Sequence, residues 1–452
     1  MIIAKRLKGK AISAWLGAPG DAIRRAVTQV KSAVKSTPRR LDVYFDISDP
    51  WSYITAQAVA RLVEAYPVEL AFTTVTPPAT DVNPQPILRT MYSLKDAAEL
   101  ADYYDVEFPG KGEADAGMVR DIGAVLVRQR PAREQLACAL QLAQTLWSKD
   151  KKKLVSLMGT WGSEAHGSVL PILNTAYGEL RKAGHYQGAM IHFDGTWYWG
   201  IDRLPYLESA LAAAFGGKSD ERGARSTPEG GAEVNDRANV VTPRPEVDRG
   251  PKKLSDKPLS CEMWFSFRSP YSYLALEQIE GILAPHGVPL VLRQIYPMVA
   301  RGAQLPNVKR MYIAHDAKRE ADRSNIPFGE ICDPLGEGVE NCLAIQHWAN
   351  GRGAGMRFAQ SAMRGIWSEA RDVAEYVDLK VIVERADLPW EEAKAAISDA
   401  AALKVAHDNA ADLNGIGLWG VPSFRIGDFV TWGQDRLPLL ADRLRRHRLA
   451  TT

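Results

Sequence analysis

The sequence predicts an α/β protein made of two similar domains in tandem, each carrying an inserted helical segment. Two observations lead to this prediction: a long internal repeat, and the order of strand-like and helix-like patterns within each copy. With a shift of 220 positions, residues 44–53 lie over residues 264–273. The two copies differ where the first helix would begin, because Asp49 in the first copy faces Ser269 in the second.

The repeat extends far beyond this stretch. Without a gap, the same shift aligns Pro77 with Pro297, Phe108 with Phe328, Met91-Tyr92 with Met311-Tyr312, and Trp147-Ser148 with Trp367-Ser368. Near the end of each copy the shift grows to 233, where residues 199–205 lie over residues 432–438. One identity could arise by chance, but this series indicates a duplication with insertions between the copies.

Composition places the chain among ordinary globular proteins and gives the expected domains. It has 452 residues, of which 46% are hydrophobic and 24% charged, as is typical of a soluble protein of two or three domains. The net charge of +2 gives no reason to expect nucleic-acid binding. Residues 216–258 are rich in Gly, Ser, Pro and mixed charge, which predicts a flexible linker between domains at 41–215 and 259–448.

Residues 1–40 form a basic arm, with ten Lys and Arg against one Asp. An amphipathic targeting helix and a helix packed on the first copy both fit this composition. No apolar run reaches the roughly 18 residues of a membrane span, and residues 1–25 lack a sustained apolar core like that of a secretory signal. We therefore expect a cytoplasmic location and no membrane partner.

The cysteines predict neither a disulfide framework nor a metal site. The four cysteines do not recur between the copies and form no C-x-x-C pair. They are Cys138, Cys261, Cys332 and Cys342.

Each copy has the same predicted order of elements. Strands are expected at 41–47 and 261–267, then a helix, then β-branched strands at 68–76 and 288–296. This strand–helix–strand unit implies a parallel pair. A long helical segment follows, including patterns at 373–386 and 389–402 in the second copy. Two short strands at 423–426 and 429–432 around Gly427-Asp428, and a closing helix from Arg436, complete a thioredoxin fold with an inserted helical domain.

Three segments of the second copy carry residues suited to chemistry. Ser269 precedes Pro270 at the start of the first helix, where an ordinary N-cap followed by proline would also fit. The Val421-Pro422 step before a strand would leave main-chain groups for a ligand, although an edge-strand proline would look the same. Residues 432–437 place a carboxylate and an amide at the last helix, where Asp435 could simply cap it.

Together these motifs resemble the 2-hydroxychromene-2-carboxylate isomerase family, relatives of kappa-class glutathione transferases with a DsbA-like thioredoxin fold. The motifs are residues 269–275, 420–424 and 432–437. The resemblance covers the second copy, and the first copy resembles the family more faintly.

The resemblance implies a glutathione-dependent isomerase that acts on a conjugated, aromatic-derived acid by reversible thiolate addition. Ser269 would be the catalytic residue that hydrogen-bonds the glutathione sulfur, and a hydroxyl donor at a positive helix end would favour the thiolate. Val421, before a cis proline, would pair with the peptide, and Gln434 with Asp435 would hold the γ-glutamyl end. The implied cofactor-binding residues are Val421, Pro422, Gly433, Gln434, Asp435 and Arg436.

The substrate side is less specific. Asn307 and Tyr271 are weaker candidates for substrate contact, and Arg301, Lys309 and Arg310 lie in the same region. Asp316 and Arg319 have helical spacing, which predicts a surface ion pair. The partner is expected to be a small molecule, and either an internal pseudo-dimer or a homodimer stays open.

Other functions fit parts of the pattern. A kappa-type glutathione transferase and a non-catalytic tandem thioredoxin-like binding protein are the alternatives. Disulfide exchange is disfavoured because serines stand at both redox-cysteine positions, Ser269 and Ser272. The first copy is expected to be non-catalytic, since it has Asp49 for the serine and no proline at 188–190.

Overall fold

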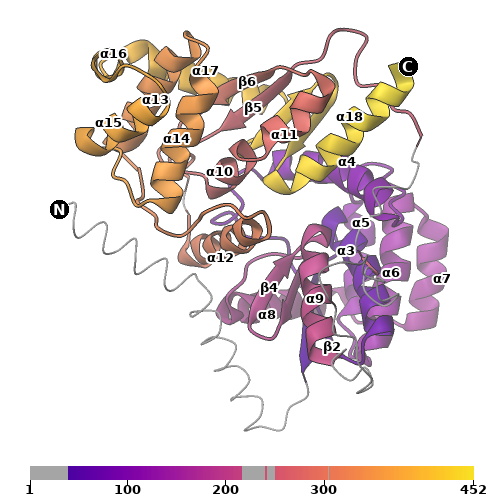
Figure 1. The fold of residues 1–452 in the computed structure, drawn as a ribbon. Coiled ribbons are helices and arrows are strands. Elements are labelled where there is room, and N and C mark those ends of the chain that lie inside the picture. The colour runs from indigo at the N-terminus through magenta and orange to yellow at the C-terminus, as the bar shows by residue number, and fades with distance from the viewer. Residues whose placement is uncertain (1–38, 216–239, 242–249, 304, 452) are drawn as a thin grey trace, which may run out of the picture. The chain divides into compact units, whose positions relative to one another are not determined.

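The computed structural model describes residues 39–215, 240–241, 250–303 and 305–451 (Figure 1). The chain divides into two compact units. The N-terminal unit holds strands β1–β4 and the C-terminal unit holds strands β5–β8. The predicted basic arm lies almost wholly outside the described residues, as does most of the predicted linker.

The N-terminal unit contains a sheet and a helical insertion. Its elements are β1 (Arg40–Asp46), α3 (Pro50–Ala65), β2 (Glu69–Val75), α4 (Pro86–Tyr104), α5 (Ala116–Leu126), α6 (Ala132–Ser148), α7 (Lys151–Trp161), α8 (His166–Ala183), β3 (Met190–Phe193), β4 (Thr196–Trp199), η1 (Ile201–Arg203) and α9 (Leu204–Phe215).

The C-terminal unit follows the same plan. Its elements are β5 (Cys261–Phe265), α10 (Pro270–Leu276), α11 (Ile279–Leu283), η2 (Ala284–His286), β6 (Leu290–Gln294), α12 (Asn307–Arg323), α13 (Glu337–Asn350), α14 (Gly355–Ser368), α15 (Tyr376–Arg385), α16 (Trp390–Ala396), α17 (Ala400–Gly415), β7 (Ser423–Ile426), β8 (Phe429–Trp432), η3 (Gln434–Arg436) and α18 (Leu437–Thr451).

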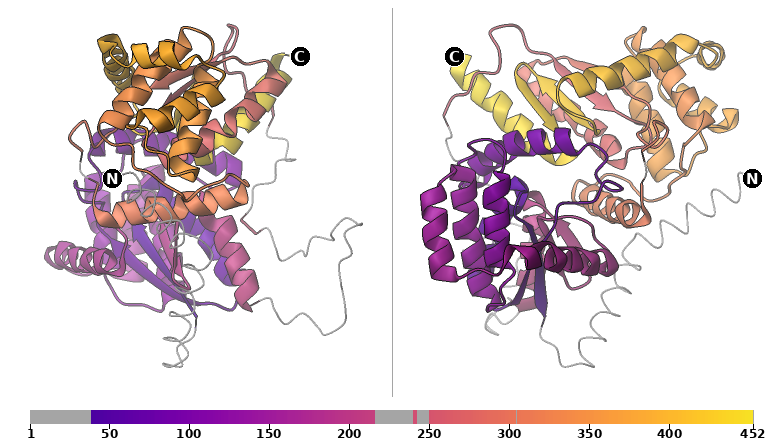
Figure 2. Two further views of the ribbon diagram at one scale, coloured as in Figure 1. Left: turned by 60° about the vertical axis from the view of Figure 1, so that its left-hand side comes forward. Right: turned by 180° about the vertical axis from the view of Figure 1, so that it is seen from behind.

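Each unit is built on a four-stranded mixed sheet. The strand orders are β2-β1-β3-β4 and β6-β5-β7-β8. The first two strands of each unit pair in parallel across a helix, as predicted, and the remaining strands pair antiparallel. In the C-terminal unit, α13 packs on α14, α16 and α17, and Figures 1 and 2 show these helices gathered in one group.

The last two strands of the C-terminal unit have the predicted bounds, but two helices differ from the prediction. The pattern at 389–402 is divided between α16, which ends at Ala396, and α17, which begins at Ala400. Asp399 causes the break, because its carboxylate accepts the Ala401 N–H at 2.9 Å and caps a new helix. The closing helix α18 begins at Leu437, after the short turn η3.

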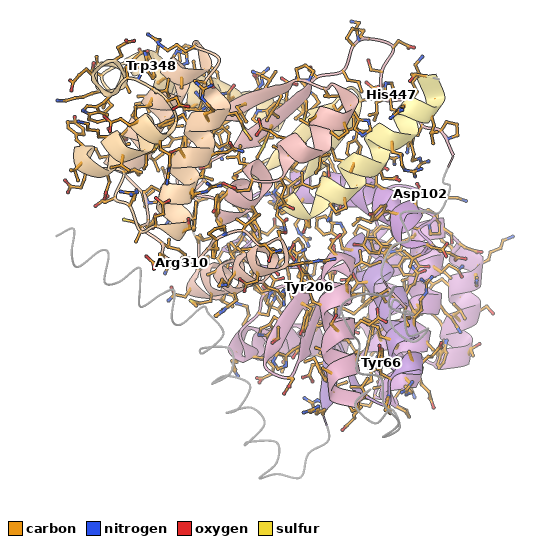
Figure 3. All side chains as sticks on the ribbon, viewed as in Figure 1. Tyr66, Asp102, Tyr206, Arg310, Trp348 and His447 are labelled. Atoms are coloured by element: carbon orange, nitrogen blue, oxygen red, sulfur yellow. The ribbon has the colours of Figure 1, made fainter. Side chains whose placement is uncertain are left out.

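Residues 250–258, which the sequence placed in the linker, are bonded to the C-terminal unit. The Leu254 N–H donates to Nδ1 of His447 on α18 (labelled in Figure 3) at 3.1 Å, and the Leu254 carbonyl accepts from Asp428 at 3.1 Å. Gly427 lies so close to this carbonyl that a Cβ there would overlap it. Glycine, with a φ of 55°, therefore permits the β7–β8 turn to receive this segment.

Trp264 links the sheet of the C-terminal unit to the insertion. Its ring is fully buried, and its Nε1–H donates to the Asn409 carbonyl of α17 at 3.0 Å. The guanidinium groups of Arg293 and Arg425 lie 5.7 and 5.6 Å from the ring centre, and both pair with Glu262. The burial of this indole and its bond to α17 hold the insertion against the strands.

A buried carboxylate fastens the insertion helix α4 to the first helix of the N-terminal unit. Asp96, only 3% exposed, accepts the Trp51 Nε1–H at 2.8 Å and the Tyr92 hydroxyl at 2.7 Å. A buried carboxylate with two donors satisfies the polar groups of both helices.

The corresponding carboxylate of the C-terminal unit is Asp316 on α12. It accepts the Tyr271 hydroxyl at 2.8 Å and pairs with Arg319. The spacing correctly predicted the pair, but its assignment to the surface is wrong, because the Asp316 side chain is only 1% exposed. The tyrosine of the neighbouring helix α10 covers it.

The Asp96 contacts predict a stability effect. Asp96→Asn keeps the volume but turns an amide N–H₂ toward one of the two buried donors. We expect the free energy of unfolding of the N-terminal unit to fall by about 1–3 kcal/mol. Urea denaturation measures this, with the exposed Glu134→Gln as the matched control. An unchanged midpoint for Asp96→Asn would show that the carboxylate does not hold the two helices.

Candidate functional site

The structure brings the three predicted segments of the C-terminal unit together at one end of its sheet. The Ser269 hydroxyl, at the start of α10, donates to the Val421 carbonyl at 3.3 Å. The Gly433 N–H, just after β8, donates to the Pro422 carbonyl at 2.9 Å. These two bonds connect the first helix start, the loop before β7 and the turn after β8.

Ser269 is the N-cap of α10. Its Oγ accepts the Ser272 N–H at 3.2 Å, and the side chain is half-buried. Ser272 is fully buried and points back to the Ser266 N–H. The Ser272 N–H therefore orients the Ser269 hydroxyl, and the hydroxyl hydrogen is directed toward the Val421 loop.

The Val421–Pro422 peptide bond is cis, which confirms the prediction made for it. The Val421 carbonyl accepts from Ser269, while the Val421 N–H makes no hydrogen bond within the described part of the chain. Gly420 lies against the indole of Trp432, where a Cβ would overlap the ring. The loop thus presents a main-chain donor beside the serine, a suitable edge for an extended peptide.

The turn η3 provides the polar groups of the last segment. Gln434 is 5% exposed, and its Nε2 donates to Oε2 of Glu320 on α12 at 2.9 Å. The half-buried Asp435 carboxylate lies 3.3 Å from the Arg436 guanidinium. The N-cap residue of η3 is Gly433. Gly433, with a φ of 108°, leaves room for this carboxylate.

The weaker substrate candidates are arranged differently. The Tyr271 hydroxyl is bonded to Asp316, so its ring is fixed on the α10 side of α12. Asn307, the exposed first residue of α12, accepts from the exposed Arg310 (labelled in Figure 3). Arg301 donates to the Tyr296 carbonyl at 3.1 Å, and burial lowers its pKa. Among the described residues, no hydrogen bond or ion pair joins Asn307 to Ser269.

Glu320 is a site residue that the sequence prediction missed. It follows Asp316 by four positions, so both carboxylates lie on one face of α12. That spacing was visible in the sequence, but its partner Gln434 is more than one hundred residues away. Only the folded chain brings the two side chains together.

The N-terminal unit has a different set of groups at the equivalent place. Asp49 caps α3, accepts the Ser52 hydroxyl at 3.0 Å and lies 3.5 Å from the Arg89 guanidinium. Asp46 is also buried and accepts the Ser48 hydroxyl at 2.8 Å. Burial raises the pKa of Asp49; burial, with the charge of Asp49, raises the pKa of Asp46 to about 7.

The loop before β3 closes over this acidic pair. A Cβ on Gly188 would come within 2.6 Å of the Asp46 Cβ and 2.7 Å of the Ser52 Oγ. The Gly200 N–H donates to the Ala189 carbonyl at 2.8 Å, as Gly433 does to Pro422 in the C-terminal unit. The backbone frame is therefore shared, but here the loop lies directly on the side chains.

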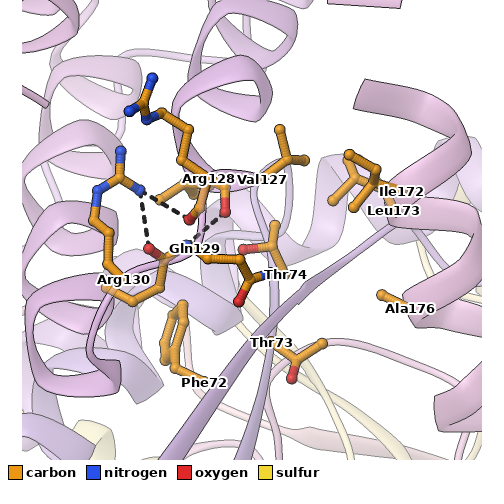
Figure 4. Close-up of a pocket in the computed structure, with 12 residues that line it drawn as sticks. Phe72, Thr73, Thr74, Val127, Arg128, Gln129, Arg130, Ile172, Leu173 and Ala176 are labelled. Carbon is orange, nitrogen blue, oxygen red and sulfur yellow. Dashed lines mark hydrogen bonds between the residues drawn. The ribbon is translucent and has the colours of Figure 1, made fainter. Parts of the chain in front are cut away.

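The N-terminal unit also has a small cavity between β2 and helices α5, α6 and α8 (Figure 4). Arg130 and Gln135, two residues of its polar lining, are hydrogen-bonded to the fold. Arg130 donates to the Val125 carbonyl at 2.8 Å and to Gln135 Oε1 at 3.0 Å. These bonds hold the cavity lining to the C-terminal end of α5, so the two side chains have a structural role.

The cysteines and acidic groups add no second reactive centre. All four cysteines are buried and none forms a disulfide, and burial raises the pKa of Cys138 to about 11 and of Cys261 to about 12. Among the described residues, no group of His, Cys, Asp and Glu side chains is placed to hold a metal ion. No helix in that part of the chain has the length and apolar character needed to cross a membrane.

One family model matches the C-terminal half of the chain. Residues 261–445 match the family model described as a DSBA-like thioredoxin domain. No curated protein matches the chain.

Several solved structures are similar at low identity. A 2-hydroxychromene-2-carboxylate isomerase is 21% identical over 42% of this chain and 98% of its own, with a TM-score of 0.38. A probable DsbA oxidoreductase from Streptomyces coelicolor is 18% identical over 43% and 90%, with a TM-score of 0.35. The cytosolic disulfide reductase DsbM from Pseudomonas aeruginosa is 18% identical over 43% and 100%, with a TM-score of 0.34.

Likeness at this level says nothing about a shared activity. The strand order, the inserted helices and the match of residues 261–445 agree with one another. The C-terminal half of the chain is a DsbA-like thioredoxin domain.

Proposed function

We propose that this protein is a glutathione-dependent isomerase resembling the 2-hydroxychromene-2-carboxylate isomerases, with its active site in the C-terminal unit. The observation that supports this best is the Ser269 hydroxyl, half-buried at the start of α10 and directed at the Val421 carbonyl 3.3 Å away. A hydroxyl held beside a cis-proline loop can donate to a sulfur anion without itself reacting. The substrate class is a conjugated, aromatic-derived acid.

Glutathione fits the groups that the three segments present. The Val421 main chain offers an N–H and a carbonyl for the cysteinyl peptide. Pro422 fixes that loop, and Gly433, Gln434, Asp435 and Arg436 form the turn for the γ-glutamyl end. When bound, glutathione supplies the thiolate that adds reversibly to a conjugated carbon, so that a double bond becomes single, rotates and reforms.

The protein's own contribution is to orient a donor and to bind. The Ser272 N–H donates to Ser269 Oγ at 3.2 Å, which polarises the hydroxyl and strengthens its own donation. On binding, the hydroxyl would turn from the Val421 carbonyl to the sulfur and favour the thiolate form. Tyr271, held by Asp316, would border the substrate from α10.

Disulfide exchange is a poorer fit, although the fold is shared with oxidoreductases. Ser269 and Ser272 stand where a redox pair would need thiols. The four cysteines are buried, which raises the pKa of Cys138 and Cys261 well above neutrality. Cysteines that form no disulfide are consistent with a reducing, cytoplasmic location, which we include in the proposal. A kappa-type transferase would use the same cofactor site.

We propose further that the two halves, residues 41–215 and 259–448, are a tandem duplicate whose first copy is non-catalytic. A carboxylate at the position of Asp49 would lie beside a bound thiolate and oppose its charge. Gly188 lies against Asp46 and Ser52, so the loop already fills the space above them. The role left to this copy is to stabilise the chain.

Replacing Ser269 tests the active-site assignment. Ser269→Ala removes one hydrogen bond to a charged sulfur, worth about 1.5–3 kcal/mol, so turnover should fall about ten- to a hundredfold. Glutathione-dependent isomerisation of a chromene carboxylate measures this. The exposed Ser398→Ala is the control and should keep wild-type turnover. Full activity in Ser269→Ala would refute the role given to the hydroxyl.

The acidic pair of the N-terminal unit predicts a pH-dependent stability. An unfolded aspartate has a pKa of about 4, whereas the pKa of Asp46 in the folded unit is about 7. Between these values the folded unit binds more protons than the unfolded chain, so the free energy of unfolding falls as pH rises and levels off above about 7.

Asp46→Asn has no carboxyl proton to lose at this position. Its free energy of unfolding should therefore fall much less with rising pH than that of the wild type. Urea denaturation of the two proteins from pH 5 to pH 8 measures it. Glu64→Gln, an exposed carboxylate on α3, serves as the control. Parallel profiles for wild type and Asp46→Asn would contradict the prediction.

A further inference from the structure

The contact between Glu320 and Gln434 fixes which way the carboxamide of Gln434 faces. The Gln434 nitrogen lies 2.9 Å from Oε2 of Glu320. A carboxylate has only acceptor atoms at neutral pH, so the group facing it must be the amide N–H₂. The Gln434 oxygen must then point away from Glu320. The orientation of the amide therefore follows from the carboxylate that it faces.

Helix α12 holds Glu320 in that place from a second point. One turn earlier, Asp316 accepts the Tyr271 hydroxyl at 2.8 Å and pairs with Arg319. Tyr271 is two residues after Ser269 on α10. The same face of α12 is thus bonded to the first helix and to the turn η3, the two ends of the proposed cofactor site.

The consequence concerns the polarity of the turn. One N–H of Gln434 is used by Glu320, and the amide oxygen, directed away from Glu320, is the acceptor that Gln434 can offer a ligand. The neighbouring Asp435 carboxylate offers only oxygens, although Arg436 lies 3.3 Å from it. Two acceptors side by side suit a ligand group that carries several donors and a positive charge.

We propose that Glu320 is a positioning residue that makes the η3 turn selective for a free α-ammonium group. This inference rests on the proposed function, since it identifies the group of glutathione that the turn binds, which is the ammonium of the γ-glutamyl residue. Glu320 acts through Gln434 and touches no reacting atom. Without the Glu320 carboxylate, the Gln434 amide can rotate and present its N–H₂ group to the ligand. That group repels an ammonium and donates to an acceptor.

The test compares two ligands on the full-length protein. One is glutathione, and the other is its desamino analogue, in which hydrogen replaces the α-ammonium. Calorimetry should show that the wild type prefers glutathione by about ten- to a hundredfold, as expected for a hydrogen bond to a charged group. Glu320→Gln should reduce this preference by about tenfold, mainly by weakening the binding of glutathione.

The control is Asp322→Asn, an exposed carboxylate two residues further along α12, which should keep the wild-type preference. Glu320→Ala is the second variant, and circular dichroism verifies that each variant is folded. If the role of Glu320 were purely structural, its variants would bind both ligands more weakly by the same factor. The ratio of the two affinities would then be unchanged.

The outcomes separate the two proposals. If the wild type prefers glutathione and folded Glu320 variants keep that preference, the role of Glu320 is refuted while the proposed function stands. If the wild type binds neither ligand, both proposals fail. A preference that falls in the Glu320 variants and not in Asp322→Asn supports the inference.

Discussion

The candidate site depends on the bond between a buried carboxylate and the first helix. Asp316 is buried and accepts the Tyr271 hydroxyl at 2.8 Å, so moving α12 away from α10 would break a hydrogen bond to a buried charged group. This bond helps to hold α12 in place, and α12 in turn positions Gln434 through Glu320. The polar groups of the site are thus placed by the insertion as much as by the sheet.

The N-terminal unit keeps this constraint and changes the chemistry above it. Asp96 accepts from Trp51 and Tyr92 much as Asp316 accepts from Tyr271, so the helix packing survives. At the start of the first helix, however, Asp49 is buried with Arg89. One frame therefore supports a neutral hydroxyl in one unit and a buried ion pair in the other. The proposed division into catalytic and supporting halves follows from this difference.

Much of this could be predicted from the sequence because the signals were local. Strand patterns and the Val421-Pro422 step lie within a few residues, and similar strand patterns occur in both halves of the sequence. Two features of the candidate site and its supporting helix could not be predicted. Asp316 was assigned to the surface because helical spacing shows an ion pair but not the tyrosine that covers it. The Glu320–Gln434 contact joins residues 114 positions apart, which no local pattern reveals.

The most direct test of the central claim is a crystal structure of the full-length protein with glutathione. We expect one glutathione per chain, in the C-terminal unit, with its sulfur within about 3.5 Å of Ser269 Oγ and its peptide along Val421. The acidic site around Asp49 should hold none. Glutathione bound at Asp49, or equally at both units, or with its sulfur directed away from Ser269, would contradict this account.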